Sequence, residues 1–222
     1  MNNIFLIGDS TCQTNDESTF PQVGWGQFFE EYLKNPAKVH NFAKNGRSSK
    51  SFFEEHRFDS VIENFTDGDF LFIQFGHNDE KEDKERKTEP YGTYKDYLSK
   101  YIDFAKSKNG TPVLLSSIYR RKFVGDKLEN NNHGKFPEAM KELAIEKDVI
   151  FIDLCSLTKE KIENEGPEKS KEYFMNFKSG EYPNYPEGKE DNTHLREKGA
   201  RMVLELLTNE MRKYPELNKL LK

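Results

Sequence analysis

The chain has 222 residues, a formal net charge of −5 and a mean hydropathy of −0.92, with 33% charged residues. Its 18 Phe, 10 Tyr and single Trp supply ample core material, which argues against disorder and fits one large α/β domain. No apolar run reaches the roughly 18 residues of a membrane-spanning helix. The mild acidity argues against a nucleic-acid-binding protein, which usually has a basic face.

The cysteines and the N-terminus bear on the cellular compartment. Cys12 and Cys155 are too few for a disulfide framework and predict free thiols in a reducing environment. The apolar residues 4–7 follow the start directly, without the basic and long apolar regions of a signal peptide. We therefore expect a cytoplasmic protein, with a secreted protein as the alternative if the chain is a mature form.

Short apolar segments alternate with longer amphipathic ones. In chain order, strands are predicted at residues 3–7, 38–42, 69–75, 111–118 and 149–154, and helices at 25–33, 51–65, 91–106, 136–147 and 196–213. The third and fourth strands are apolar on both faces, as buried parallel strands require. The alternation predicts a flavodoxin-like three-layer α/β/α sandwich with a five-stranded parallel sheet in the order 2-1-3-4-5, in a single domain spanning residues 1–222.

Two polar segments interrupt this alternation. Residues 80–89 form a charge run directly after the third strand and predict a solvated loop. Residues 159–190 are polar, with Gly, Pro and Asn scattered late in the segment. They predict a helical insertion and then a long loop before the last helix, without a domain boundary.

Four short polar segments lie at predicted strand ends or before the last helix. They are Gly8-Asp9-Ser10-Thr11, residues 41–49, Gly76-His77-Asn78-Asp79 and Asp191-Asn192-Thr193-His194. In parallel α/β sheets the working residues gather at the carboxyl ends of the strands. We therefore expect these segments to meet.

The residue types in these segments suit acyl transfer. Ser10 needs a base to become a nucleophile, and His194 is the natural candidate. Asp191, three residues earlier, can meet the far ring nitrogen in a tight turn and stabilise the imidazolium. The backbone N–H groups of Ser10 and Gly46 and the amide of Asn78 can form an oxyanion hole.

Each of these residues also has a purely structural interpretation. Ser10 can cap a helix, and Asp191 can be the N-cap of the final helix with His194 beside it. Gly46 and Asn78 can be simple turn residues. The order and placement of the four segments together favour the catalytic interpretation.

The segments resemble the four blocks of the SGNH (GDSL-type) hydrolases, with Ser10, Gly46, Asn78 and His194 as the name-giving residues. The resemblance extends to the rhamnogalacturonan acetylesterase family, number 12 of the carbohydrate esterases. It covers residues 4 to about 206 and includes Gly24-Trp25-Gly26-Gln27, Gly46-Arg47-Ser48-Ser49 and residues 74–79, 118–121 and 191–195. The resemblance implies a flavodoxin-like sandwich that removes acetyl groups from galacturonate in the pectin backbone.

Three further residues are candidates for substrate binding. Arg120 and Arg121 follow the fourth strand and could bind a galacturonate carboxylate, although surface charge or packing explains them equally well. His133, in an Asn-rich loop, could line the same groove. Trp25 and Cys12 are expected to be packed side chains.

We predict a serine esterase that deacetylates a pectin-derived saccharide through an acetyl-enzyme. Its partner is an acetylated oligosaccharide, and no nucleic acid or membrane partner is expected. No cofactor is implied, and the spacing of the five histidines does not favour a metal site. The alternatives are an acetylesterase, lipase or thioesterase acting on other esters, a saccharide-binding module, and a flavodoxin-like cofactor module. The acetylated hydroxyl and the oligomeric state stay open.

Overall fold

The structure, a computed structural model that describes residues 2–222, is built around a five-stranded parallel sheet. Its strands lie in the order β2 (Val39–Asn41), β1 (Ile4–Gly8), β3 (Phe70–Gln74), β4 (Thr111–Leu115) and β7 (Ile150–Ile152). Each neighbouring pair is parallel. Counted along the chain, this is the predicted order 2-1-3-4-5.

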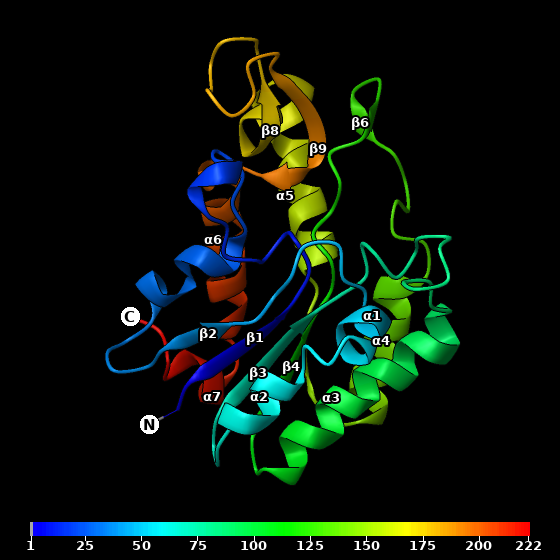
Figure 1. Ribbon diagram of the computed structural model, residues 1–222, viewed down its shortest axis with the longest axis vertical. Helices are drawn as coiled ribbons and strands as arrows, with labels where there is room; N and C mark the ends of the chain where they lie inside the picture. The colour runs from blue at the N-terminus through cyan, green and yellow to red at the C-terminus, as the bar shows by residue number, and fades with distance from the viewer. Residues whose placement is uncertain (1) are drawn as a thin grey trace.

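Alternate side chains of the strands enter two separate cores, because successive residues of a strand point to opposite faces. Ile4 and Leu6 of β1 belong to one core, and Phe5 and Ile7 belong to the other. The second core is covered by α1 (Ser49–Glu54), α2 (Asp59–Asn64), α3 (Lys95–Ser107) and α4 (Phe136–Glu146). The first is covered by η2 (Trp25–Tyr32), α5 (Leu154–Lys169), α6 (Glu197–Met211) and α7 (Pro215–Asn218). Figure 1 shows the resulting three layers, as predicted.

Several predicted helices are shorter or tighter than expected. The predicted helix 51–65 is two helices, α1 and α2, separated at His56, whose φ of 57° breaks the helical path. The break lets Phe52 and Phe58 enter the same core. The predicted helix 25–33 is the 3₁₀ segment η2, and a π-helical turn, η3 (Pro90–Tyr94), precedes α3. A short 3₁₀ turn, η1 (Glu17–Thr19), comes before η2.

The prediction of a long loop before the last helix was wrong. After α5 the chain forms a 3₁₀ turn, η4 (Ser170–Tyr173), and then an antiparallel hairpin of β8 (Phe174–Phe177) and β9 (Lys189–Leu195). Figure 1 shows this hairpin beyond the end of the sheet. A second hairpin, β5 (Phe123–Val124) with β6 (Lys127–Leu128), was also missed.

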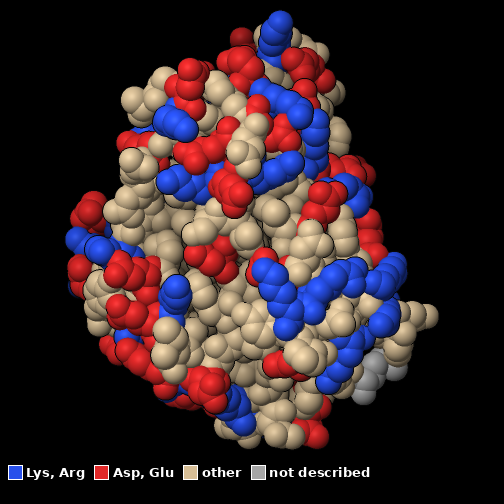
Figure 2. Space-filling model, turned by 180° about the vertical axis from the view of Figure 1, so that it is seen from behind, with Lys and Arg blue, Asp and Glu red and all other residues tan. Residues whose placement is uncertain are grey.

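Both cysteines are buried free thiols. Burial raises the pKa of the Cys12 thiol well above its usual range, which fits a packed side chain. On the face shown in Figure 2, acidic and basic side chains are intermingled. Within residues 2–222, no helix combines the length and the apolar character needed to cross a membrane.

Candidate active site

The structure brings Ser10, His194 and Asp191 into one hydrogen-bonded array. Ser10 follows β1, and its Oγ lies 3.0 Å from Nε2 of His194. Nδ1 of the same ring lies 2.8 Å from Oδ2 of Asp191. Nε2 can therefore accept the Ser10 proton while Nδ1–H donates to the carboxylate. The tight meeting of Asp191 and His194 matches the sequence prediction.

An irregularity in β9 places the acid and the base on one side of the hairpin. Met175 of β8 pairs with Asp191, whereas the residue before it in β8, Phe174, pairs with Leu195. The three residues between Asp191 and Leu195 therefore bulge out of the ladder. In a regular strand, residues three apart point to opposite faces. The bulge removes this separation, and Asp191 does not cap α6, whose N-cap is Arg196.

Asp191 is held as a carboxylate by several donors. Its Oδ1 accepts the backbone N–H groups of Thr193 (2.8 Å) and His194 (3.0 Å). Partial burial favours the neutral acid, but the hydrogen bond and charge of His194 and the two backbone donors outweigh it. The pKa of Asp191 therefore lies well below its ordinary value. The carboxylate is available to stabilise the imidazolium across the neutral pH range.

Arg121 anchors the hairpin that carries this pair. Its backbone N–H donates to the carbonyl of Asn192 (2.9 Å), and its guanidinium donates to Oδ1 of the same residue (2.7 Å). The guanidinium also donates to Oγ of Ser170 (3.0 Å) and to the carbonyl of Pro167. Because Arg121 is buried and its donors meet protein acceptors, the structure favours a positioning role over substrate binding.

The segments that carry the predicted oxyanion donors are hydrogen-bonded to one another at the carboxyl edge of the sheet. Asn78 follows β3, and its Nδ2 donates to the carbonyl of Arg47 (3.1 Å), next to Gly46. Gly46 has a φ of +76°, a conformation that favours glycine. The same segment is tied to the nucleophile loop, because the N–H of Lys44 donates to the carbonyl of Gly8 (2.9 Å).

A buried network holds the loop of Ser10. Oδ1 of Asp9 accepts the N–H (2.9 Å) and the hydroxyl (2.8 Å) of Thr11. Gln74 donates to the Thr11 hydroxyl (3.1 Å) and accepts from the indole of Trp25 (2.6 Å). Trp25 is fully buried against the sheet, as predicted, and its indole also fixes the nucleophile loop.

Three buried titratable groups beside the catalytic residues were not predicted from the sequence. Nδ1 of His77 lies 3.3 Å from Oδ2 of Asp9, and burial lowers the pKa of His77 to about 4. Asp79 accepts from the N–H of Ser49 (3.0 Å) and the hydroxyl of Thr88 (3.1 Å). Burial raises the pKa of Asp79 to about 7. The available signal was adjacency, because these residues flank Ser10 and Asn78.

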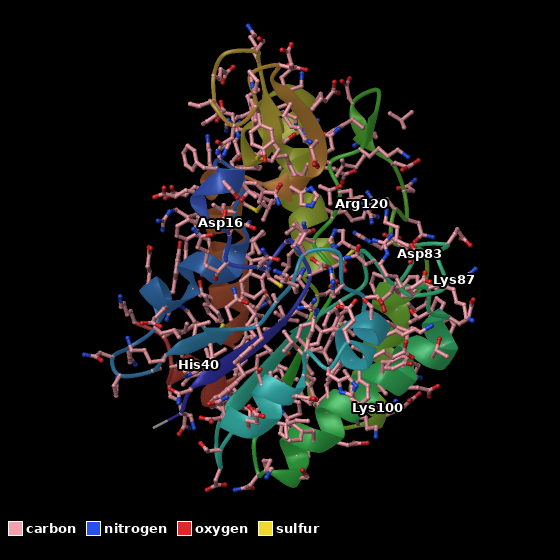
Figure 3. All side chains as sticks on the ribbon, viewed as in Figure 1. Asp16, His40, Asp83, Lys87, Lys100 and Arg120 are labelled. Carbon is pink, nitrogen blue, oxygen red and sulfur yellow. The ribbon has the colours of Figure 1, made fainter. Side chains whose placement is uncertain are left out.

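Arg120 and His133 lie together near the oxyanion segment. Arg120 forms an ion pair with Glu80 and donates to the carbonyls of Asn132 (2.8 Å) and His77 (3.3 Å). Nε2 of His133 is 2.8 Å from the carbonyl of Ile118, and the ring is almost fully buried. Arg120 keeps partial exposure and is labelled in Figure 3, whereas His133 is buried inside the protein.

Comparison with known proteins identifies the family of this chain. Residues 4–207 match the model of the GDSL-like Lipase/Acylhydrolase family. The chain belongs to this family. It is 45% identical over 204 residues to rhamnogalacturonan acetylesterase RhgT of Bacillus subtilis strain 168, and the match covers 92% of this chain and 87% of that protein.

Solved structures share the fold of this GDSL-like hydrolase. Protein YXIM of Bacillus subtilis superposes with a TM-score of 0.81 at 22% identity, covering 96% of this chain and 56% of that one. An acetylxylan esterase from Geobacillus stearothermophilus superposes with a TM-score of 0.65 at 16% identity, covering 94% and 93% of the two chains. At these identities the likeness concerns the fold.

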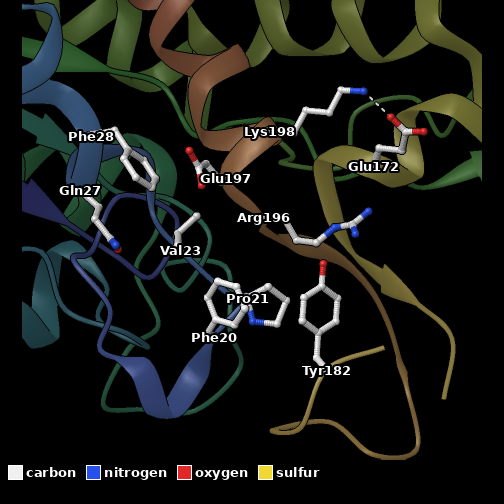
Figure 4. A pocket seen from close by; sticks show the side chains of 10 residues that line it. All are labelled: Phe20, Pro21, Val23, Gln27, Phe28, Glu172, Tyr182, Arg196, Glu197 and Lys198. Carbon is white, nitrogen blue, oxygen red and sulfur yellow. Dashed lines mark hydrogen bonds and ion pairs between the residues drawn. The ribbon is translucent and has the colours of Figure 1, made fainter. Parts of the chain in front are cut away.

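A cavity of about 610 Å³ lies near the hairpin of β8 and β9 in this GDSL-like hydrolase (Figure 4). Its lining includes Phe20, Tyr182 and Arg196, and none of the three triad side chains. Val23, also in the lining, bridges Leu195 next to His194 through a backbone hydrogen bond of 2.9 Å. A backbone hydrogen bond therefore connects the wall of the cavity to the residue that follows His194.

Among residues 2–222, no group of three or more His, Cys, Asp and Glu side chains is arranged to hold a metal ion. The acid–base groups around Ser10 are instead paired with one another or with backbone donors.

Proposed function

We propose that this GDSL-like hydrolase is a serine esterase that removes O-acetyl groups from pectin-derived saccharides. The observation that carries the proposal is the array from Ser10 Oγ through His194 to Asp191, with distances of 3.0 and 2.8 Å. The substrate class is supported by the 45% identity to a rhamnogalacturonan acetylesterase along nearly the whole chain.

The geometry supports a two-step acyl transfer. Oγ of Ser10 attacks the acetyl carbonyl carbon while Nε2 of His194 takes the hydroxyl proton. The N–H groups of Ser10 and Gly46 and the amide of Asn78 stabilise the oxyanion. The intermediate collapses, and the sugar oxygen leaves with the proton from His194. Water then attacks the acetyl-enzyme with His194 as base, and acetate and free Ser10 result.

The three predicted substrate-binding residues divide into two groups. We propose that Arg120 is the one that can reach a substrate carboxylate, because its side chain is partly exposed, whereas Arg121 and His133 are buried. Burial opposes ionisation of Glu80, yet its contacts with His133 and Arg120 keep its pKa below the usual range. Glu80 is therefore a carboxylate that competes for Arg120.

This competition predicts a substrate-dependent effect of Arg120→Ala. The KM for acidic acetylated oligosaccharides should rise, and the KM for a small neutral acetate ester should change little. Steady-state kinetics on both substrates measure this. An equal loss on both would show that Arg120 supports the fold of the site.

The proposed function is tested by acetate release from acetylated rhamnogalacturonan oligomers, set beside acetylated xylan, for the wild type and Ser10→Ala. We expect the wild type to prefer the rhamnogalacturonan oligomers and Ser10→Ala to release no acetate above background. A preference for xylan would favour an acetylesterase that acts on other sugars. Release by Ser10→Ala would overturn the mechanism.

A further inference from the structure

The charged segment 80–89 contains an arginine, Arg86, that is held in place by a neighbouring carboxylate. Within it, Arg86 is clamped by Asp83: Nε lies 3.0 Å from both carboxylate oxygens, and a terminal nitrogen lies 2.6 Å from Oδ2. The hydrogen bond and charge of Asp83 raise the pKa of Arg86. The guanidinium is thus held at a fixed place with its charge intact. Figure 3 shows Asp83 and Lys87 of this segment on the same side of the molecule as Arg120.

The other terminal nitrogen of Arg86 points to the candidate oxyanion hole. It donates to Oδ1 of Asn78 over 3.3 Å. At its opposite end, the same amide donates from Nδ2 to the carbonyl of Arg47. Asn78 is therefore held on both sides by groups from two different loops.

These two partners specify the orientation of the amide. A guanidinium can only donate, so it selects the oxygen of Asn78, and a backbone carbonyl can only accept, so it selects the nitrogen. The two ends of an amide are nearly equal in shape, and a flipped Asn78 would turn a carbonyl oxygen toward the developing oxyanion. Nδ2 carries two hydrogens, and Arg47 uses one. The second is left for the substrate.

We propose that Arg86 is a positioning residue for the oxyanion hole. It fixes the Asn78 amide in the donating orientation, and its positive charge at Oδ1 polarises the amide so that the free N–H donates more strongly. Asp83 holds Arg86 in place for this role. The proposal rests on the proposed esterase function, since it assigns Asn78 to the oxyanion.

The expected size of the effect follows from the role of Asn78. Loss of one oxyanion donor lowers kcat by about 10²- to 10³-fold in serine hydrolysis. Loss of Arg86 leaves the amide present but disordered, so the decrease should be smaller, roughly 10-fold. KM for a small neutral ester should stay within about twofold, because the donor acts on charge that develops after binding.

The test is a double-mutant cycle on a small neutral acetate ester. The variants are Arg86→Met, Asn78→Ala and the double variant, with Arg86→Lys as a conservative replacement. Lys87→Met is the matched control, because this neighbouring cation pairs with Glu82 and does not contact Asn78. Circular dichroism and Tm measured for every variant separate misfolding from the kinetic effect.

We expect Arg86→Met to lower kcat in the wild-type background and to have no further effect on kcat in Asn78→Ala. Lys87→Met should leave kcat unchanged, and Arg86→Lys should recover part of the loss. The proposal is overturned if kcat falls equally in both backgrounds, if it does not fall at all, or if only KM for the neutral ester rises. If Asn78→Ala itself keeps full activity, Asn78 is not an oxyanion donor and the proposal for Arg86 is overturned with it. If the wild type hydrolyses no acetate ester, the proposed function fails instead.

Discussion

The side chains around Ser10 differ in how directly they meet the reacting atoms. In the proposed mechanism, Ser10 forms the bond to the acyl carbon, and His194, whose Nε2 lies 3.0 Å from the Ser10 hydroxyl, moves the proton. Asp191 touches only the far side of the imidazole. Arg86 is one contact further away and acts through Asn78. The size of each mutational effect should follow this order.

Substitution of the triad tests that order. Ser10→Ala and His194→Ala should each lower kcat on the order of 10⁶-fold, and Asp191→Ala roughly 10⁴-fold, by analogy with serine proteases. Removal of the Asp191 carboxylate should lower kcat less, because this group orients and stabilises the imidazolium without transferring the proton itself. Steady-state kinetics on one activated acetate ester provide the comparison. A larger loss for Asp191→Ala than for His194→Ala would contradict the assignment of His194 as the base.

At the scale of elements, the sheet was predictable and the catalytic hairpin was not. The central strands β1, β3 and β4 are largely apolar on both faces, so they stand out in the sequence. In contrast, β9 reads Lys-Glu-Asp-Asn-Thr-His-Leu, with a single apolar residue at its end. Its strand conformation comes from pairing with β8, and its bulge is held by Arg121.

Some residues of the candidate site could be predicted from the sequence, and others could not. Ser10, Gly46, Asn78 and His194 were predicted because their residue types and order suit acyl transfer. Residues that act through neighbours, such as Arg86 and Asp79, have no sequence pattern of their own. Their roles depend on contacts across 8 and 30 positions of the chain, to Asn78 and Ser49, respectively.

Arg121→Ala tests whether Arg121 anchors the hairpin of β8 and β9. The change removes the donors to Asn192, Ser170 and Pro167 and leaves buried acceptors unsatisfied. We expect a loss of stability of about 2 kcal/mol and a fall in kcat on neutral and acidic substrates alike. Denaturant unfolding and kinetics on both substrate types measure this. A rise in KM confined to acidic substrates would show that Arg121 binds the substrate carboxylate.

At the scale of the whole molecule, buried Asp79 and His77 give opposite pH dependences of stability. Burial raises the pKa of Asp79 from 3.8 to about 7, so its stabilising contribution is complete below about pH 4 and is lost as pH rises to about 7. Burial lowers the pKa of His77 from 6.5 to about 4, so its contribution is complete above about pH 6.5 and is lost as pH falls to about 4. Between these values each contribution changes by about 1.4 kcal/mol per pH unit.

The Asp79→Asn variant should separate the two contributions. With the carboxyl removed, the free energy of unfolding should rise with pH from about 4 to 6.5, relative to the flatter profile of the wild type. Urea unfolding at a series of pH values measures it. Asp126→Asn, at an exposed carboxylate in the turn between β5 and β6, is the control and should follow the wild type. A profile of Asp79→Asn parallel to the wild type would contradict the buried-acid account.

The central claim is that Ser10 is the nucleophile of an esterase, and covalent labelling tests it most directly. The wild type is treated with a fluorophosphonate, digested, and the modified residue is mapped by mass spectrometry. We predict one phosphonyl group per chain, on Ser10, with loss of acetate release in proportion to labelling. A label on another residue, or full activity of a fully labelled protein, would contradict the account.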